Sequence, residues 1–234
     1  MSTQLPFPPV VLGISGASGS GKTTLALQLA RTLGGVHFSL DSYYRDLSHL
    51  PMAERAQRNF DDPAMIESPL LAAHVAALAR GEAIQRPVYD FASYTRLPHQ
   101  TQTVGPIVGP GACLLVEGLF ALYFPELRPL YHLKIYVDTQ DDLCYSRRLR
   151  RDIEERGRDE QSVRQQYDST VRPCAIAFVR PLIDFADLVV DGSDALDFKI
   201  EQVLTAMKKR GLRRREDLSE SPQSPPISRK MRNS

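Results

Sequence analysis

The 234-residue chain lacks several features that would mark particular classes of protein. Its 29 basic and 28 acidic residues nearly balance, so the net charge of +1 provides no overall attraction to nucleic acid or to a membrane surface. No apolar run approaches the roughly 20 residues that a membrane-spanning helix needs. The first nine residues contain neither a basic start nor an apolar stretch, which argues against a signal peptide. We therefore expect a globular, cytoplasmic protein that binds neither nucleic acid nor a membrane.

Cysteine is also scarce. The chain has three cysteines, Cys113, Cys144 and Cys174, with no C-x-x-C spacing and no even-numbered framework. They predict reduced thiols in a cytoplasmic protein rather than a disulfide scaffold.

The first feature that carries chemistry is a glycine-rich segment that fits the phosphate-loop pattern G-x-x-x-x-G-K-[ST] at every fixed position. An apolar run at 10–14 predicts a buried strand before it, and leucines four residues apart predict a helix over 24–33 after it. The alternative, a glycine-rich connector without function, would not require a strand before it and a helix after it. Glycine lets successive N–H groups point at phosphate oxygens, Lys22 would reach the β- and γ-phosphates, and Thr23 would hold Mg²⁺. The predicted triphosphate site comprises Gly16, Ala17, Ser18, Gly19, Ser20, Gly21, Lys22, Thr23 and Thr24.

Two further predicted strands end on carboxylates. The strand at 36–40 is followed by Asp41, and the strand at 113–116 ends at Glu117. Ligands gather at the carboxyl ends of parallel strands, so Asp41 is the first candidate for the base that orients an acceptor hydroxyl, with a helix cap as the alternative. Glu117 fits a carboxylate that reaches Mg²⁺ directly or through water. Further strands are predicted at 133–138 and 188–191, with a last helix at 195–210.

The middle of the chain predicts a helix followed by a small β-rich insertion. Ser68 fits the helix cap, Pro69 the first helical position, and Gly81 the end of the helix. Residues 82–110 form the predicted insertion, and its segment 86–96 alternates aromatic and polar residues. These aromatic side chains could belong either to a core or to a binding surface.

Arginine concentrates in a predicted helix over 141–156 and just beyond it, at positions 147, 148, 150, 151, 156 and 158. This segment could be a solvated helix with internal ion pairs or a lid whose guanidinium groups clamp phosphates. From Gly211 the composition becomes polar and basic, which predicts a disordered tail.

Together these motifs resemble the uridine–cytidine kinase family, among the phosphate-loop kinases that include phosphoribulokinase. The resemblance spans about 11–192. It rests on residues 16–24, Asp41-Ser42-Tyr43-Tyr44, Asn59-Phe60-Asp61, Pro87-Val88-Tyr89-Asp90-Phe91, Glu117-Gly118 and the arginine-rich segment 147–158.

The resemblance implies an α/β fold: a doubly wound parallel sheet with a β-rich insertion and an arginine-rich helical lid. It places a kinase domain at 1–210, with the insertion at 82–110 and the lid at 141–168, followed by the basic tail at 211–234. It also implies ATP and Mg²⁺ as cofactors, phosphorylation of the 5′-hydroxyl of uridine or cytidine in pyrimidine salvage, and a homotetramer.

The site residues carried over from the family fall into three groups. The catalytic group comprises Asp41 as the base facing the 5′-hydroxyl, Lys22, and the ATP-binding lid residues Arg151 and Arg156. The magnesium pair is Thr23 with Glu117. The nucleoside group has walls at Tyr44, Phe60, Tyr89 and Phe91, ribose partners at Asp61 and Arg148, and further candidates at Tyr94, Arg96, Arg158 and Gln166.

The chain departs from the family at three places. Tyr94 replaces a histidine that faces the pyrimidine edge, Asp62 replaces the histidine after Phe60-Asp61, and Cys144-Tyr145 replaces an Arg-Leu pair. A phenol hydroxyl can both donate and accept, but one whose proton is committed to a neighbour only accepts, which suits the cytosine amine. Tyr94 therefore suggests a preference for cytidine.

Two rival functions remain open. A phosphoribulokinase-like kinase would need basic residues where this chain has aromatic ones. A nucleotide-dependent switch would need a guanine-specifying N-K-x-D segment, which the sequence lacks. RNA binding through the basic tail is a more distant alternative.

Overall fold

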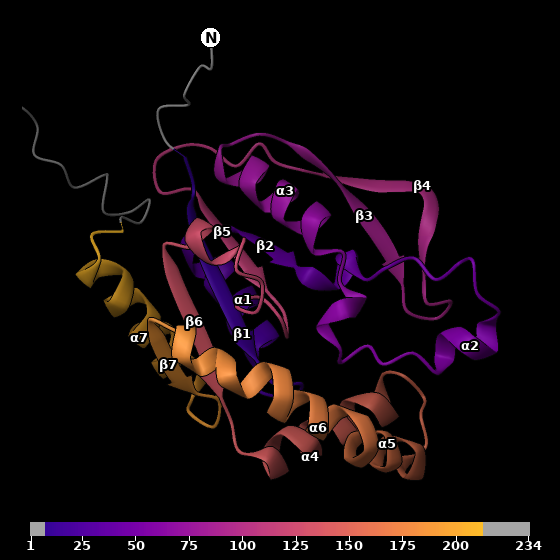
Figure 1. Ribbon diagram of the computed structural model, residues 1–234. Coiled ribbons are helices and arrows are strands. Elements are labelled where there is room, and N and C mark those ends of the chain that lie inside the picture. The colour runs from indigo at the N-terminus through magenta and orange to yellow at the C-terminus, as the bar shows by residue number, and fades with distance from the viewer. Residues whose placement is uncertain (1–7, 213–234) are drawn as a thin grey trace, which may run out of the picture.

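A parallel five-stranded sheet forms the centre of the computed structural model, which describes residues 8–212 (Figure 1). Its order is β2-β5-β1-β6-β7, and every neighbouring pair is parallel. The strands are β1 (Val10–Gly16), β2 (Val36–Ser39), β5 (Cys113–Glu117), β6 (Leu133–Asp138) and β7 (Leu188–Asp191). The predicted doubly wound sheet is confirmed.

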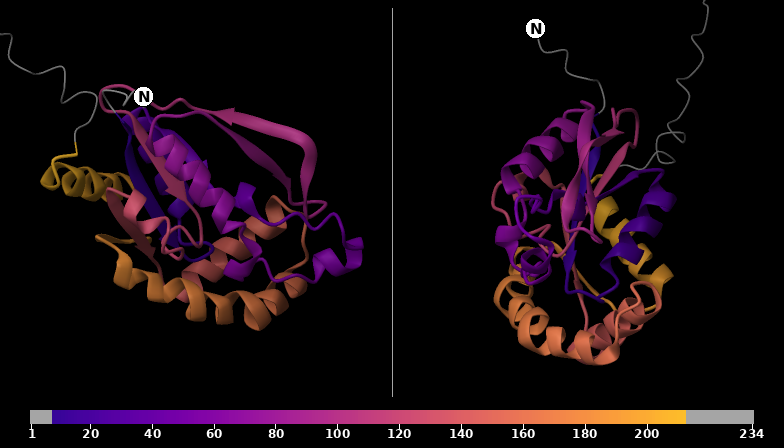
Figure 2. Two further views of the ribbon diagram at one scale, coloured as in Figure 1. Left: turned by 45° about the horizontal axis from the view of Figure 1, so that its top comes forward. Right: turned by 90° about the vertical axis from the view of Figure 1, so that its right-hand side faces the viewer.

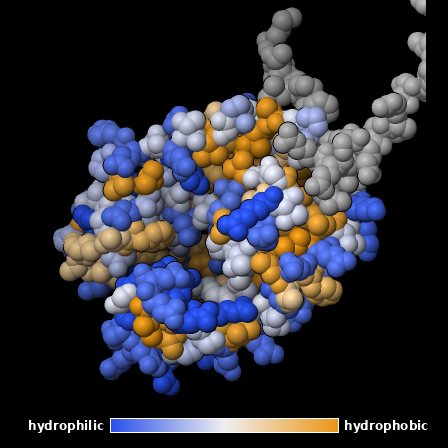
Figure 3. Space-filling view, turned by 180° about the vertical axis from the view of Figure 1, so that it is seen from behind, coloured by the Kyte–Doolittle hydropathy of each residue, from blue (hydrophilic) through white to orange (hydrophobic). Residues whose placement is uncertain are grey.

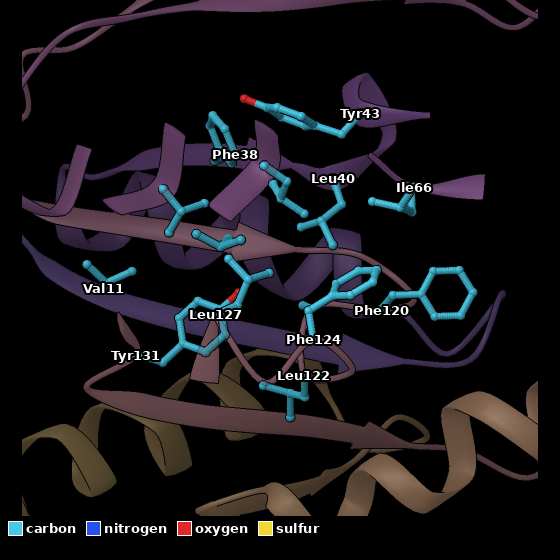
Figure 4. Close-up of a cluster of buried hydrophobic side chains, with 14 of the residues drawn as sticks. Val11, Phe38, Leu40, Tyr43, Ile66, Phe120, Leu122, Phe124, Leu127 and Tyr131 are labelled. Carbon is cyan, nitrogen blue, oxygen red and sulfur yellow. The ribbon is translucent and has the colours of Figure 1, made fainter. Parts of the chain in front are cut away.

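Helices cover both faces of this sheet, which explains why its strands are apolar without alternation. In β1, Val11 packs into one buried cluster with α3 (Ser68–Ala79), whereas Leu12 and Ile14 pack into the other with α1 (Lys22–Leu33) and α7 (Leu196–Lys209). The first cluster also takes in the segment after β5, and Figure 4 shows Phe120, Phe124 and Leu127 of this segment beside strand residues. Both faces of β1 are therefore buried against helices.

The strand order brings the candidate functional residues together at one edge of the sheet. The chain leaves β1 into the phosphate loop, leaves β2 at Asp41, and leaves β5 at Glu117. Since β5 lies between β1 and β2, all three exits are neighbours. The order also reverses direction beside β1, and such a switch point is where open α/β sheets bind ligands.

An antiparallel hairpin and a helical lid flank this edge. The hairpin, β3 (Ile84–Asp90) and β4 (Thr95–Val104), lies within the predicted insertion, near the short helix α2 (Met52–Ala56). The lid contains α4 (Asp141–Glu154) and α5 (Glu160–Gln166). Figure 2 shows the hairpin and the lid on opposite sides of the same end of the sheet.

Several helix boundaries differ from the sequence predictions. Ser68 does not cap α3, because the Glu67 carbonyl accepts the first helical hydrogen bond, from the Leu71 N–H. Gly81 does close this helix: its N–H donates to Leu78 while the next N–H donates to Ala77. The helix predicted over 141–156 stops at Glu154, and the helical path through α6 (Arg172–Cys174) to residue 185, with wide π-type turns, was not predicted.

No helix within residues 8–212 is long and apolar enough to span a membrane. Beyond its first two residues, the predicted tail at 211–234 lies outside the described residues.

Candidate active site

A cavity of about 680 Å³ opens at the carboxyl edge of the sheet. Seen from behind, the surface of the molecule is hollowed near its middle, with hydrophilic side chains below the hollow (Figure 3). The candidate residues that line the cavity are Ser18, Lys22, Thr23, Asp41, Tyr44, Phe60, Asp61, Phe91, Tyr94, Glu117, Arg148, Arg151, Arg156, Arg158 and Gln166. The fold thus brings together residues that lie up to 148 positions apart, from Ser18 to Gln166.

The phosphate loop adopts a backbone conformation that requires glycine at two positions. Gly19 and Gly21 have φ angles of 84° and 94°, in the left-handed region that favours glycine. A Cβ on Gly19 would collide with the carbonyl oxygen of Cys144 in α4, so the loop also packs closely against the lid helix. Helix α1 begins at Lys22, whose Nζ lies 3.4 Å from the Ala17 oxygen. The loop N–H groups and the helix N-terminus form a site for anionic oxygens.

Asp41 lies at the cavity floor, in a 3₁₀ turn at the end of β2. Ser39 caps this turn by accepting a hydrogen bond from the Asp41 N–H at 3.2 Å, so Asp41 is not the cap. Asp41 is exposed to solvent in the cavity, which the protein encloses in part. Burial and the nearby Glu117 charge raise the pKa of the Asp41 carboxyl above its ordinary value, although Lys22 opposes them.

Thr23 and Glu117 form a compact oxygen pair beside Asp41. Thr23 Oγ1 donates to Glu117 Oε2 at 3.1 Å, and Glu117 is almost fully buried. Burial opposes ionisation of Glu117, but His37, whose Nε2 lies 3.4 Å away, together with Lys22, outweighs it and lowers the pKa of this carboxyl. A hydroxyl and an ionised carboxylate beside a phosphate site suit Mg²⁺, which prefers oxygen ligands and keeps several waters. The two residues fit the predicted metal.

Asp61 and Arg148 face each other across the cavity wall. Both are buried, with Arg148 Nη1 4.0 Å from Asp61 Oδ1. The Arg148 guanidinium also donates to Ser18 Oγ at 3.0 Å and to Gln166 Oε1 at 3.3 Å. Burial raises the pKa of Asp61 despite the opposing charge of Arg148. Arg148 therefore connects the phosphate loop, the lid and Asp61.

Aromatic side chains form the opposite wall. Phe60 and Tyr94 stack with ring centroids 5.3 Å apart, while Tyr44 contacts Phe60 edge-on and lies 5.9 Å from Phe91. Phe91 is 48% exposed, so this large ring presents a free face to the cavity. Tyr89 does not line the cavity but packs behind Tyr44 and Phe91. The two interpretations of this segment both apply, since its rings form core on one side and cavity wall on the other.

Arg96 lies outside this cavity. Its guanidinium pairs with Glu67 and donates to the carbonyl oxygens of Tyr43 and Tyr44 at 3.2 and 3.0 Å. It lines a separate hollow of about 460 Å³. Arg96 thus braces the turn that carries Tyr44.

Three residues of the site were not predicted from the sequence. His37 lies beside Glu117, Arg147 donates to the Gly192 carbonyl at 3.2 Å behind the phosphate loop, and the buried Asp152 binds the lid arginines. For His37 no sequence signal exists. Asp152 belongs to the arginine-rich segment 147–158 on which the resemblance rests, but nothing in the sequence shows that it binds several of the arginines. At the Cys144-Tyr145 departure, Tyr145 packs against Tyr167 with centroids 4.8 Å apart.

Comparisons with known proteins show which family the chain belongs to. The sequence profile of the phosphoribulokinase/uridine kinase family matches residues 11–198. A uridine kinase from Chloroflexus aggregans is 42% identical over 205 residues, covering 86% of this chain and 96% of that protein. A uridine kinase from Deinococcus deserti is 44% identical over 185 residues, covering 78% and 87%. Among solved structures, phosphoribulokinase from Rhodobacter spheroides shares the fold, with a TM-score of 0.57 and 17% identity over 80% of this chain and 73% of that chain.

Proposed function

Because the chain belongs to the phosphoribulokinase/uridine kinase family, we propose that it transfers the γ-phosphoryl group of ATP to the 5′-hydroxyl of a pyrimidine ribonucleoside. The products would be UMP or CMP, formed in pyrimidine salvage. One observation carries the proposal: a single cavity joins a phosphate loop to an aromatic wall, with the Asp41 carboxylate between them. From the same family relationship we propose a homotetramer that works in the cytoplasm.

The chain's own residues account for phosphoryl transfer. Asp41 would accept a hydrogen bond from the 5′-hydroxyl and take its proton as the new bond to phosphorus forms. Lys22, Arg151 and Arg156 would stabilise charge on the β- and γ-phosphates. Thr23 and Glu117 would hold Mg²⁺, which, when bound, neutralises phosphate charge. Closure of the lid over the cavity would exclude water and limit hydrolysis of ATP.

The buried pair of Asp61 and Arg148 supports recognition of ribose. A carboxylate and a guanidinium can bond the 2′- and 3′-hydroxyls together. With a deoxyribonucleoside, one of these buried polar groups would lose its partner, which costs about 1–3 kcal/mol or more for a charged group. We therefore propose selection for ribonucleosides over deoxyribonucleosides.

Tyr94 supports a preference for cytidine within this class. Its backbone lies in the left-handed region, with φ of 55°, and its ring stacks on Phe60 at the cavity wall. The preference requires that the phenol proton be committed to another group when the nucleoside binds. The oxygen would then only accept, which suits the N4 amine of cytosine better than the O4 carbonyl of uracil. Replacement by histidine, which can serve either base, would move the cytidine-to-uridine ratio of kcat/KM toward one. An unchanged ratio in Tyr94→His would contradict this preference.

The experiment that tests the activity is ADP release with Mg·ATP and a panel of acceptors. Uridine, cytidine, deoxycytidine, adenosine and ribulose 5-phosphate would each be measured against a blank without acceptor. Turnover confined to uridine and cytidine is the expected result. Turnover on ribulose 5-phosphate alone would favour a sugar-phosphate kinase, and binding of ATP without turnover on any acceptor would favour a nucleotide-dependent switch.

A further inference from the structure

Four guanidinium groups converge on one carboxylate in the lid. Asp152, in the last turn of α4, has no exposed surface. The arginine nitrogens within 4 Å of its oxygens belong to Arg151 at 3.0 Å, Arg156 at 3.2 Å, Arg158 at 3.5 Å and Arg148 at 3.6 Å. A carboxylate this deeply buried is retained only when opposite charge compensates it.

The arginines in turn depend on this carboxylate to compensate their positive charge. Burial and the neighbouring charge of Arg151 lower the pKa of Arg156, whereas Asp152 opposes both effects. The one other ion-pair partner of the group within residues 8–212 is Asp61, 4.0 Å from Arg148. Without Asp152, the guanidinium groups would repel one another across the cavity mouth.

The four arginines fall into two pairs that differ in how they are held. Arg148 and Arg158 both donate to Gln166, and Arg148 also donates to Ser18 while Arg158 donates to Ser162. Arg151 and Arg156 have no side-chain partner other than Asp152 in the described part of the chain. All four line the cavity, and the side chain of Arg156 is the most exposed of them, at 51%. Arg151 is 33% exposed, close to the 29% of Arg158, so the hydrogen-bond partners are what separate the two pairs. One pair is fixed and the other is free to exchange its anion.

We propose that Asp152 is a positioning residue that holds Arg151 and Arg156 at the cavity in place of phosphate. When the donor's phosphates enter, these two arginines exchange the carboxylate for phosphate oxygens, which accept bidentate guanidinium bonds equally well. Arg148 and Arg158 keep Asp152 in place throughout. The inference rests on the proposed function for the identity of the anion, but the resting arrangement is a property of the free protein.

Limited trypsin digestion tests the resting arrangement, because trypsin cuts after arginine only where the chain opens locally. In Asp152→Asn without ligand, we expect cleavage after the lid arginines to be faster by about tenfold, the effect of roughly 1.4 kcal/mol on a local opening equilibrium. Saturating inorganic tripolyphosphate with Mg²⁺ replaces the lost anion, so variant and wild type would then be cut at the same slow rate. Glu155→Gln removes an exposed charge from the same turn and is the matched control, with wild-type cleavage throughout.

Two results would overturn the proposal. Equal cleavage of Asp152→Asn and wild type without ligand would mean that the carboxylate does not hold the lid. Fast cleavage that persists under saturating tripolyphosphate would make Asp152 a residue of the fold and not a stand-in for phosphate. Failure of the nucleoside panel with tripolyphosphate protection intact would contradict the proposed acceptor and leave the inference supported.

A second measurement needs no variant and so does not depend on whether Asp152→Asn folds. In the wild-type protein, NMR can follow the Nε–H signals of the lid arginines during titration with Mg²⁺ and tripolyphosphate. We expect large shifts for Arg151 and Arg156 and small ones for Arg158, whose bonds to Gln166 and Ser162 remain. Shifts of equal size for all three would contradict the division into a fixed and an exchanging pair.

Discussion

At the scale of single residues, the site prepares each carboxylate for a different task. Asp41 and Glu117 lie at the ends of neighbouring strands, and each is in the electric field of the other. Glu117 has Thr23 and His37 beside it and a lowered pKa, as a metal ligand requires. Asp41 has a raised pKa, as a group that receives a proton requires. The different neighbours of the two carboxylates therefore suit them to the two proposed roles, a metal ligand and a base.

Replacement of Asp41 by asparagine separates catalysis from stability. We expect kcat to fall by about 10²- to 10⁴-fold, the usual contribution of a positioned base. A raised pKa in the folded state means that ionised Asp41 costs stability once the pH exceeds its ordinary value near 3.8. At pH 7 without ligands, Asp41→Asn should therefore unfold at a higher temperature than the wild type.

Thermal unfolding at several pH values checks the sign of this effect. The stability advantage of Asp41→Asn should shrink as the pH falls through the raised pKa toward the ordinary value, because the wild-type carboxyl then becomes neutral too. As a control, Ser39→Ala removes the cap of the same turn without removing a charge, so it should lower the unfolding temperature at every pH. A lower unfolding temperature for Asp41→Asn at pH 7 would contradict the argument.

At the scale of elements, the sequence predicted what local rules determine. The strands around Val11, Leu114 and Ile135 are short apolar runs in a sheet covered on both faces, and their period and length suffice to find them. The cap at Ser68 was wrong because Glu67 is held from outside the helix, by Arg96 and by the Tyr43 carbonyl. Such tertiary contacts leave no local pattern.

Gly19 connects two elements, the phosphate loop and the lid helix, and a prediction follows from its contact. In Gly19→Ala, a left-handed backbone costs about 1–2 kcal/mol, and the new methyl group would also push the loop away from the Cys144 carbonyl. We expect loss of most affinity for Mg·ATP, measured by calorimetry, in addition to lower stability.

Gly34→Ala is the matched control. Gly34, at the end of α1, also has a positive φ, of 60°, but a Cβ at this position would meet no other part of the protein within 4 Å. This variant should lose about 1 kcal/mol of stability and bind Mg·ATP as the wild type does. Equal affinities in the two variants would mean that close packing of the loop against α4 does not shape the phosphate site.

At the scale of the whole molecule, the site depends on contacts between distant segments. The arginine-rich sequence suggested a lid, but it could not show that Arg148 turns inward to Ser18 and Asp61 while Arg151 and Arg156 share Asp152. Helical spacing places these arginines and Asp152 near one another, whereas the Ser18 partner of Arg148 lies 130 residues away. The residue types of the site were therefore predictable, and their pairing was not.

Because Arg148 bonds Ser18 of the phosphate loop and Gln166 of the lid and lies beside Asp61, it should couple the two proposed substrates. We expect Mg²⁺ with a non-hydrolysable ATP analogue to tighten nucleoside binding, and the nucleoside to tighten binding of the analogue by the same factor, within the usual range of about 5- to 150-fold. In Arg148→Lys the charge remains but the planar fork that bonds Ser18 and Gln166 together is lost, so the factor should fall toward one.

Titration calorimetry of each ligand with and without the other measures this factor. Arg150→Lys, an exposed arginine two residues further along α4, is the control and should retain wild-type coupling. Loss of affinity for both ligands with the coupling factor unchanged would make Arg148 a binding residue for each substrate separately. A coupling factor near one in Arg148→Lys, with folding intact by thermal melting, would instead assign the coupling between donor and acceptor to this guanidinium group. No other described side chain bonds both the phosphate loop and the lid while it faces Asp61.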